Sequence, residues 1–208
     1  MKGSLLIVIL LYTGIINCFY NAPRQPLQLH DKYLAPKELT SFNINGVQIR
    51  IMEPTSWITA NSRSSAGFMK LYSYISGCNS AKFQMPMSVP VITRLDKNTI
   101  SFYLPMQNPP KPVDKSLKID KLPCTTLAVR QYSGFATQAA IKQNYEILKK
   151  QLDNMGITYD SRCIVSAEYD DPMTLEGRKN EIWISIKDVV KTCQYPDGVI
   201  ASTITKSR

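Results

Sequence analysis

The sequence is poor in the residues from which most catalytic and metal sites are built. It contains one histidine, His30, and none of its cysteines forms a C-x-x-C pair. Ser–His and Cys–His mechanisms need a histidine base, and structural zinc sites use closely spaced cysteine or histidine pairs. G-x-S-x-G, H-E-x-x-H and glycine-rich phosphate-binding segments are also missing. We therefore expect that the protein is not an enzyme.

Long hydrophobic runs are also missing. The apolar stretch Leu5–Ile16, which follows a short basic start at Met1-Lys2, has the length of a signal-peptide core and is too short to span a membrane. We expect residues 1–18 to be a signal peptide; a retained N-terminal anchor is the alternative. The mature protein is then secreted and extracellular, with no integral membrane span.

Removal of this leader leaves four cysteines, Cys78, Cys124, Cys163 and Cys193. In an exported chain four cysteines indicate two disulfides, which can be paired in three ways. We favour Cys124–Cys163 with Cys78–Cys193, and four buried free thiols are the alternative.

Negative charge is in the minority, with 16 acidic residues against 25 lysines and arginines and a formal net charge of +9. A basic protein attracts anionic ligands and surfaces. The cations are scattered, however, in short pairs such as Lys149-Lys150, and they form no dense stripe of the kind that binds nucleic acid. We expect a solvated basic surface and no nucleic-acid partner.

The chain divides into a lead-in, a folded body and a tail. Residues 19–40 contain three prolines and few periodic apolar positions, which predicts an extended or disordered lead-in. Residues 41–190 carry regular apolar patterns, and residues 191–208 form a loose tail apart from Cys193. We expect a single domain over residues 41–190.

Within this domain a strand–helix–strand–strand unit is predicted twice. The first copy has a strand at 46–52, a helix at 66–77 and strands at 89–95 and 99–104. A proline-rich connector at 107–112 leads to a strand at 125–132, a helix at 137–155 and strands at 162–169 and 181–187. Each unit has an apolar sheet face and an apolar helix stripe that need cover. Two units can pair into a twisted antiparallel sheet with two helices, an α+β fold.

Six segments, in order, resemble motifs of the SOUL heme-binding family. They are Gly67–Gly77 with Asn79, Met85–Pro90, Asn108–Asp114, Val129–Ala136, Glu168–Pro172 and Gly177–Trp183. The resemblance implies a distorted antiparallel β-barrel built from two related halves and flanked by two helices. It also implies that heme or another tetrapyrrole binds in a surface groove beside the first helix.

The resemblance places a ligand-binding groove against the first predicted helix. Its apolar wall would be Phe68, Leu71, Tyr72 and Ile75, although part of that stripe must pack on the sheet. Arg178 and Lys179 would bind the heme propionates, with an exposed basic loop as the alternative. The metal ligand is unknown. His30 lies outside every motif, and Met85 and Met87 are more useful as core residues than as iron ligands.

One departure from the family pattern concerns the charge of the first helix. Ser65 and Ser73 stand where heme-binding relatives carry basic residues, and Lys70 is the only cation within that helix. We therefore interpret the chain as a secreted heme-binding or tetrapyrrole-binding protein for scavenging, buffering or transport, and keep two alternatives. One is a SOUL-fold interaction protein that does not bind heme. The other is a hydrolase-like enzyme for a small ligand, which a buried carboxylate in an enclosed pocket would favour.

Overall fold

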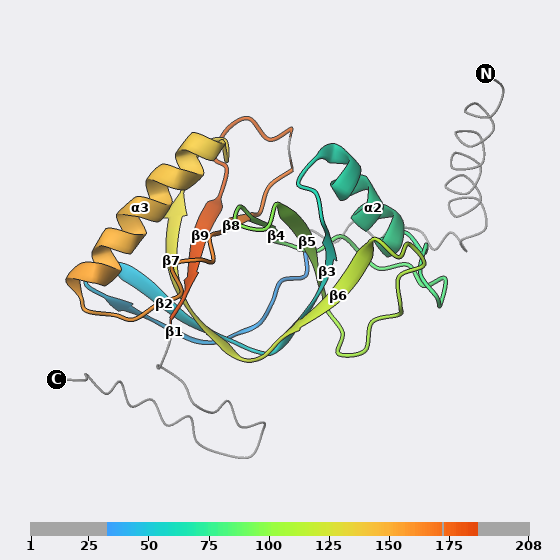
Figure 1. Ribbon diagram of the computed structural model, residues 1–208, viewed down its shortest axis with the longest axis horizontal. Coiled ribbons are helices and arrows are strands. Elements are labelled where there is room, and N and C mark those ends of the chain that lie inside the picture. The colour runs from blue at the N-terminus through green and yellow to red at the C-terminus, as the bar shows by residue number, and fades with distance from the viewer. Residues whose placement is uncertain (1–32, 172, 187–208) are drawn as a thin grey trace, which may run out of the picture.

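One curved antiparallel sheet organises the molecule (Figure 1). The computed structural model describes residues 33–171 and 173–186. Nine strands follow the order β1-β2-β7-β9-β8-β4-β5-β3-β6 across the sheet. Their bounds are β1 Glu38–Ile44, β2 Val47–Met52, β3 Thr55–Ala60, β4 Val91–Arg94, β5 Thr99–Leu104, β6 Leu117–Leu122, β7 Thr125–Tyr132, β8 Val165–Glu168 and β9 Asn180–Ser185.

The strand order shows that two related units pair side by side. Strand β4 of the first unit and strand β8 of the second are neighbours at the centre, and β5, β3 and β9, β7 follow outward on either side. Each half also adds a strand to the other half. Strand β2 pairs with β7 of the second half, and β6 pairs with β3 of the first. The predicted α+β fold with two strand–helix–strand–strand units is confirmed. Within the described chain β1 and β6 are sheet edges, so the sheet is open and the word barrel applies only loosely.

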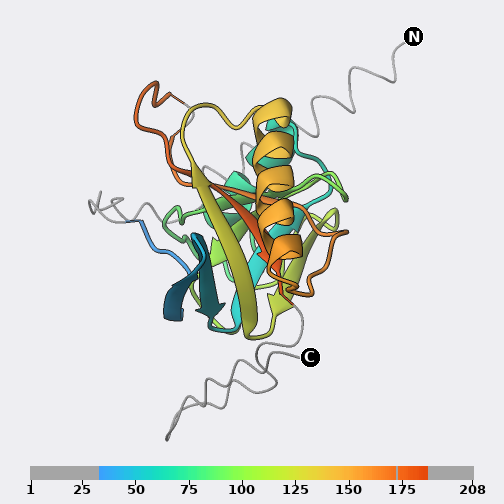
Figure 2. The same ribbon diagram turned by 90° about the vertical axis from the view of Figure 1, so that its left-hand side faces the viewer.

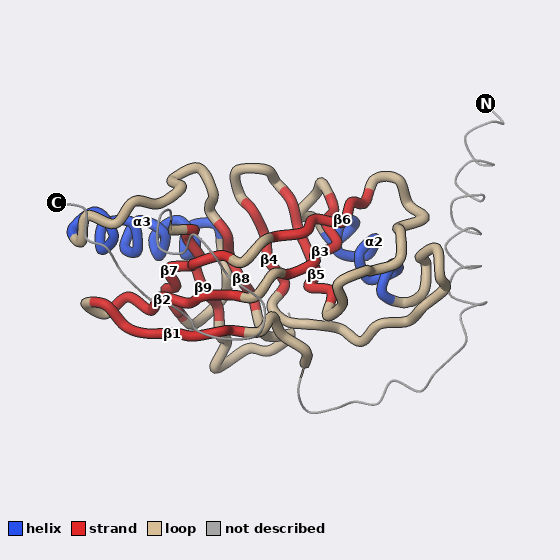
Figure 3. The backbone as a smooth tube through the Cα atoms, turned by 90° about the horizontal axis from the view of Figure 1, so that it is seen from below, coloured by secondary structure: helices blue, strands red, loops and turns tan. Residues whose placement is uncertain are grey.

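Two helices pack on the convex side of the sheet. Helix α2, Ser65–Ile75, contacts β3 and β5, and helix α3, Gln138–Asn154, contacts β7 and β9. Figure 3 shows α3 and α2 at opposite ends of the sheet, and Figure 2 looks onto the end that carries α3. The Thr137 hydroxyl caps α3 by accepting a hydrogen bond from the Ala140 amide at 3.2 Å. Neither helix is long and apolar enough to cross a membrane.

Each helix buries its apolar stripe in a cluster of its own. Under α3, residues such as Tyr145 and Leu148 pack on Ala128 and Ile182, and under α2 residues such as Leu71 pack on Ile58. Because strand residues alternate between faces, the neighbours of these sheet residues point to the concave side. A third apolar cluster, which includes Trp57, Ile92 and Trp183, lies there. The concave face is therefore the part of the sheet that no helix covers.

Three strands, β1, β3 and β6, differ from the sequence-based expectation. No strand was expected between residues 52 and 66, but residues 55–60 form β3, which leads into α2. The strand expected to open the first unit is β2. Strand β1 begins at Glu38, inside the predicted lead-in.

Several predictions concern residues outside the described part of the chain. They are the signal peptide, the C-terminal tail, His30 and Cys193, and they stay predictions.

Candidate functional site

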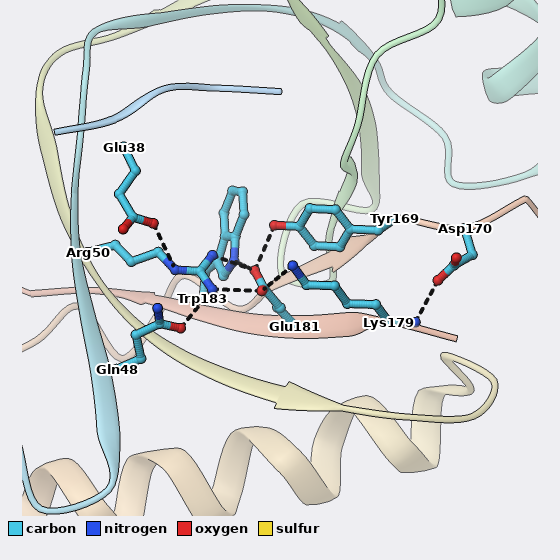
Figure 4. A network of polar contacts seen from close by, with 8 residues as sticks. All are labelled: Glu38, Gln48, Arg50, Tyr169, Asp170, Lys179, Glu181 and Trp183. Carbon is cyan, nitrogen blue, oxygen red and sulfur yellow. Dashed lines mark hydrogen bonds and ion pairs between the residues drawn. The ribbon is translucent and has the colours of Figure 1, made fainter. Parts of the chain in front are cut away.

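The concave face of the sheet has a filled end and a hollow end. The filled end is a network of polar side chains around Glu181, which is fully buried (Figure 4). Arg50 donates from Nη1 and Nη2 to the two carboxylate oxygens at 2.9 and 2.8 Å. The Tyr169 hydroxyl and the Trp183 indole N–H donate to Oε2 at 2.7 and 2.8 Å. The Lys179 ammonium lies 3.5 Å from Oε1.

Strand pairing explains why these residues meet. Strand β7 lies between β2 and β9, so the long Arg50 side chain crosses β7 to reach Glu181. Residues 181 and 183 share one face of β9 because side chains alternate along a strand. Arg50 is further held by the Gln48 amide oxygen at 2.7 Å and by the Glu38 carboxylate at 3.3 Å.

The network sets the protonation state of its members. Burial opposes ionisation of Glu181, but hydrogen bonds from Arg50, Trp183 and Tyr169 outweigh it and hold the pKa of that carboxyl below its ordinary value. Burial and the neighbouring carboxylate raise the pKa of the Tyr169 phenol. Glu181 is therefore a fully engaged anion. It has no oxygen left to take a proton from a substrate.

The hollow end is a cavity of about 760 Å³ between the concave face and the loops at its edge. Its wall includes the aliphatic side chains of Ile92, Leu127 and Val165. Trp57 and Trp183, the two tryptophans of the chain, also line it. Ligand pockets are typically of this size and are mostly apolar with a few polar groups.

Small hydroxyl residues explain why this end is hollow. On β3 and β5 the concave face carries Thr59 and Ser101, whose hydroxyls hydrogen-bond each other at 2.8 Å. Thr59 also donates to the Asp120 carboxylate at 2.7 Å. These short side chains satisfy one another and leave open the space that larger side chains fill around Glu181.

Charged residues from several loops and strand ends also line the cavity. Three cations have an acidic partner: Arg94 lies 2.6 Å from Asp96, Lys118 lies 2.9 Å from Asp120, and Arg162 lies 3.2 Å from Asp160. Two further lysines, Lys97 and Lys121, are exposed, and neither forms an ion pair within the described residues. Their charge is available to an anionic ligand.

The cysteine prediction is wrong in one pairing. Cys163 is a free cysteine at the wall of the cavity, so the favoured Cys124–Cys163 disulfide is not formed. Its half-buried thiol lies among Arg94, Asp96 and Asp160 instead of beside a second sulfur, and burial raises the pKa of this thiol. Among the described cysteines, which also include Cys78, only Cys163 is free. The pairing of Cys78 with Cys193 stays a prediction.

The expected groove residues on α2 are largely occupied by packing. Leu71 and Ile75 are 0% and 4% exposed in the cluster under α2. The Phe68 ring packs edge-on against Phe102 with centroids 5.0 Å apart. Of the predicted wall only Tyr72 is exposed, at 38%. Met85 is buried in the same cluster and Met87 packs against its edge.

The two cations predicted for the propionates are engaged elsewhere. Arg178 is 4% exposed, and its Nη1 donates to the backbone carbonyls of Asp171 and Thr174, each at 3.0 Å. Its guanidinium lies over the Phe135 ring. The Lys179 ammonium lies 4.3 Å from the centroid of the Tyr169 ring. None of the six residues predicted to bind ligand lines the cavity, and their role in ligand binding stays a prediction.

Comparison with known proteins shows the family. The model of the SOUL heme-binding protein family matches residues 35–185, which include every strand and both helices. This chain belongs to the SOUL heme-binding protein family.

Among the relatives of this SOUL protein, human heme-binding protein 2 is 28% identical over 160 residues, which are 68% of this chain and 78% of that protein. Heme-binding protein 1 of Mus musculus is 32% identical over 127 residues, 55% of this chain and 67% of that protein. A hydrolase from Listeria innocua shares 10% identity with a TM-score of 0.49 over 67% of this chain and 91% of that one. That similarity is too low to bear on function. The recognised relatives support heme binding at the level of the family, and they are binding proteins rather than enzymes.

Proposed function

We propose that this protein binds heme or a closely related tetrapyrrole and serves as a carrier or buffer outside the cell. The observation that carries the proposal is the match to the SOUL heme-binding family over residues 35–185. The match includes the complete sheet and both helices, so the whole architecture of the family domain supports it.

The side chains on the concave face fit the organic part of heme. The macrocycle is a flat apolar disc and needs apolar walls, while its two carboxylates need cations. Leu122 and Leu127 supply apolar surface at the cavity, and Lys97 and Lys121 supply such cations. When bound, heme would supply an iron that takes an axial ligand from the protein or from solvent. Of the side chains that line the cavity, only Met52 and Cys163 belong to the residue types that commonly ligate heme iron.

The hydrolase alternative loses its main support. A buried carboxylate aimed into an enclosed pocket would have favoured it, but Glu181 is bound by Arg50, Tyr169 and Trp183 and does not line the cavity. The alternative of an interaction protein without heme remains, and the departures at Ser65 and Ser73 are the observation that favours it.

Export is the second part of the proposal. It rests on the predicted leader at residues 1–18 and on the cysteines, because Cys163 is the only free cysteine among the described residues. Protein recovered from a secreting host should begin near residue 19, and without reductant it should carry at least one disulfide together with the free thiol of Cys163. A chain that keeps residues 1–18 and stays inside the host would contradict export.

The test of binding is an absorbance titration of the oxidised mature protein with hemin. Serum albumin is the positive control, and the same protein in denaturant is the negative control. We expect a saturable shift of the Soret band with an end point at one hemin per chain. A linear, non-saturating change that matches the denatured sample would leave the interaction-protein alternative.

A further inference from the structure

We infer that the cavity on the concave face is a second ligand site, which binds a short saccharide that carries sulfate or carboxylate groups. The sheet beneath the cavity presents free hydroxyls, and two ammonium groups, those of Lys97 and Lys121, lack an acidic partner in the described chain. The inference goes beyond the proposed function. It concerns another class of ligand and does not depend on where the tetrapyrrole binds.

Small hydroxyl side chains form the sheet surface under the cavity. They come from β3, β5, β7 and β9 and are Thr55, Thr59, Thr99, Ser101, Thr125 and Ser185. Four of these hydroxyls take part in hydrogen bonds within the fold. The hydroxyls of Thr99 and Ser185 form none with any described residue, so they are available to a ligand. Because a hydroxyl both donates and accepts, this surface matches the hydroxyl groups of a sugar.

The charges at the cavity leave an excess of two cations. Every described acidic side chain that lines it is already paired, with nitrogen–oxygen distances between 2.6 and 3.2 Å, in Glu53–Lys37, Asp96–Arg94, Asp120–Lys118 and Asp160–Arg162. Lys97, in the turn after β4, and Lys121, on β6, are left over; Lys121 only approaches the Asn108 amide oxygen at 3.5 Å. Two ammonium groups from different elements match a ligand with anionic groups on separate sugar units.

Apolar side chains line the same cavity beside the polar ones. Leu122, Leu127 and Val165 come from β6, β7 and β8, and Leu122 is 43% exposed. A sugar ring carries C–H groups on its faces as well as hydroxyls, so it can contact both kinds of surface at once. A purely apolar ligand would instead bury the hydroxyls of Thr99 and Ser185 without a hydrogen-bond partner, which is unfavourable. The cavity of about 760 Å³ has the volume of a ligand pocket.

The test titrates the oxidised mature protein with a heparin-derived tetrasaccharide, followed by isothermal titration calorimetry. Maltotetraose is the neutral control, and sodium sulfate is the free-anion control. Lys97→Glu/Lys121→Glu reverses the two unpaired charges, and Lys142→Glu/Lys150→Glu makes the same net change at exposed positions of α3. Thr99→Val replaces the free hydroxyl by a methyl group of the same shape and keeps a β-branched residue in β5. Circular dichroism and thermal melting verify that each variant is folded.

We expect one tetrasaccharide per chain and no saturable binding of maltotetraose or sulfate. Lys97→Glu/Lys121→Glu should weaken the affinity by about tenfold or more, and Thr99→Val by about fivefold, the effect of one lost hydrogen bond. The α3 control pair should stay within about twofold of the unsubstituted protein.

Equal losses in the two lysine pairs would show that binding follows the net charge instead of the cavity, and would overturn the inference. Saturable binding of sulfate alone, or no binding of the tetrasaccharide, would overturn it as well. A hemin titration of the same sample keeps the two claims apart, because a protein that binds the tetrasaccharide but not hemin contradicts only the proposed function.

Discussion

Arg50 and Glu181 stand 131 residues apart in the sequence and meet in a bidentate ion pair, with N–O distances of 2.9 and 2.8 Å. The pair links β2, which precedes the first helix, to β9, the last strand of the second unit, across the intervening β7. It also fixes the Trp183 indole, which forms part of the cavity wall. One buried contact therefore connects the assembly of the sheet with the geometry of the cavity wall.

Removal of Arg50 should destabilise the protein strongly. Arg50→Ala leaves the Glu181 carboxylate buried without its charge partner, which costs about 3–5 kcal/mol in comparable pairs. Urea denaturation followed by tryptophan fluorescence measures the free energy of unfolding. Lys118→Ala, which breaks an ion pair whose lysine is exposed, is the control and should cost less than about 1 kcal/mol. Equal, small losses in both variants would show that the pair does not organise the sheet.

The same pair should make the free energy of unfolding decrease at acidic pH. Since the pKa of Glu181 is lowered by folding, its contribution is present above its ordinary value of 4.5 and is lost as the pH falls below that toward the folded-state pKa. The difference in unfolding free energy between the unsubstituted protein and Glu181→Gln should therefore be largest near neutral pH and shrink below about pH 4. A difference that stays constant from pH 7 to pH 3 would argue against an ionised Glu181.

The buried Glu168 carboxyl should give the unfolding free energy the opposite pH dependence. Burial raises the pKa of this carboxyl despite the nearby Arg178 charge. A raised folded-state pKa means that the contribution of Glu168 to stability is present below its ordinary value of 4.5 and is lost as the pH rises through the folded-state pKa. Glu168→Gln should therefore raise the unfolding free energy at pH 7 and have little effect near pH 4. Denaturation at both pH values checks this; a Gln variant that is less stable at pH 7 would contradict it.

Cys163 provides a chemical probe of the cavity wall. Burial raises the pKa of its thiol, so less of the reactive thiolate is present, and labelling of Cys163 by a disulfide reagent at pH 8 should be slower in the folded protein than in denaturant. Cys163→Ser should abolish the labelling at this position. Equal labelling rates at Cys163 in the folded and the denatured protein would contradict the buried environment of the thiol.

The sequence allowed prediction of the elements with strong periodicity. Helix α3 and strands β5 and β7 occur where the apolar spacing indicates them, since a repeating apolar face is typical of an element that is buried on one side. Strand β3 was missed because residues 56–60 are buried on both faces and show no alternation. Strand β6 was missed because it is an edge strand in which three of the six residues are charged.

The site was less predictable than the fold. Arg50 and Glu181 meet only because β7 lies between their strands. No local sequence pattern predicts which strands are neighbours or in which register they pair. The apolar stripe of α2 was a reasonable candidate for a ligand surface. The sequence alone, however, does not show how much of such a stripe is buried against the sheet.

The central claim, that this SOUL protein binds one tetrapyrrole, is most directly tested by the amide and indole N–H resonances of a ¹⁵N-labelled sample titrated with zinc protoporphyrin IX. This porphyrin is diamagnetic, and its ring current shifts only protons close to it. The account predicts that a limited group of neighbouring resonances shifts and saturates at one porphyrin per chain. Small shifts that are spread over the spectrum and do not saturate would contradict it.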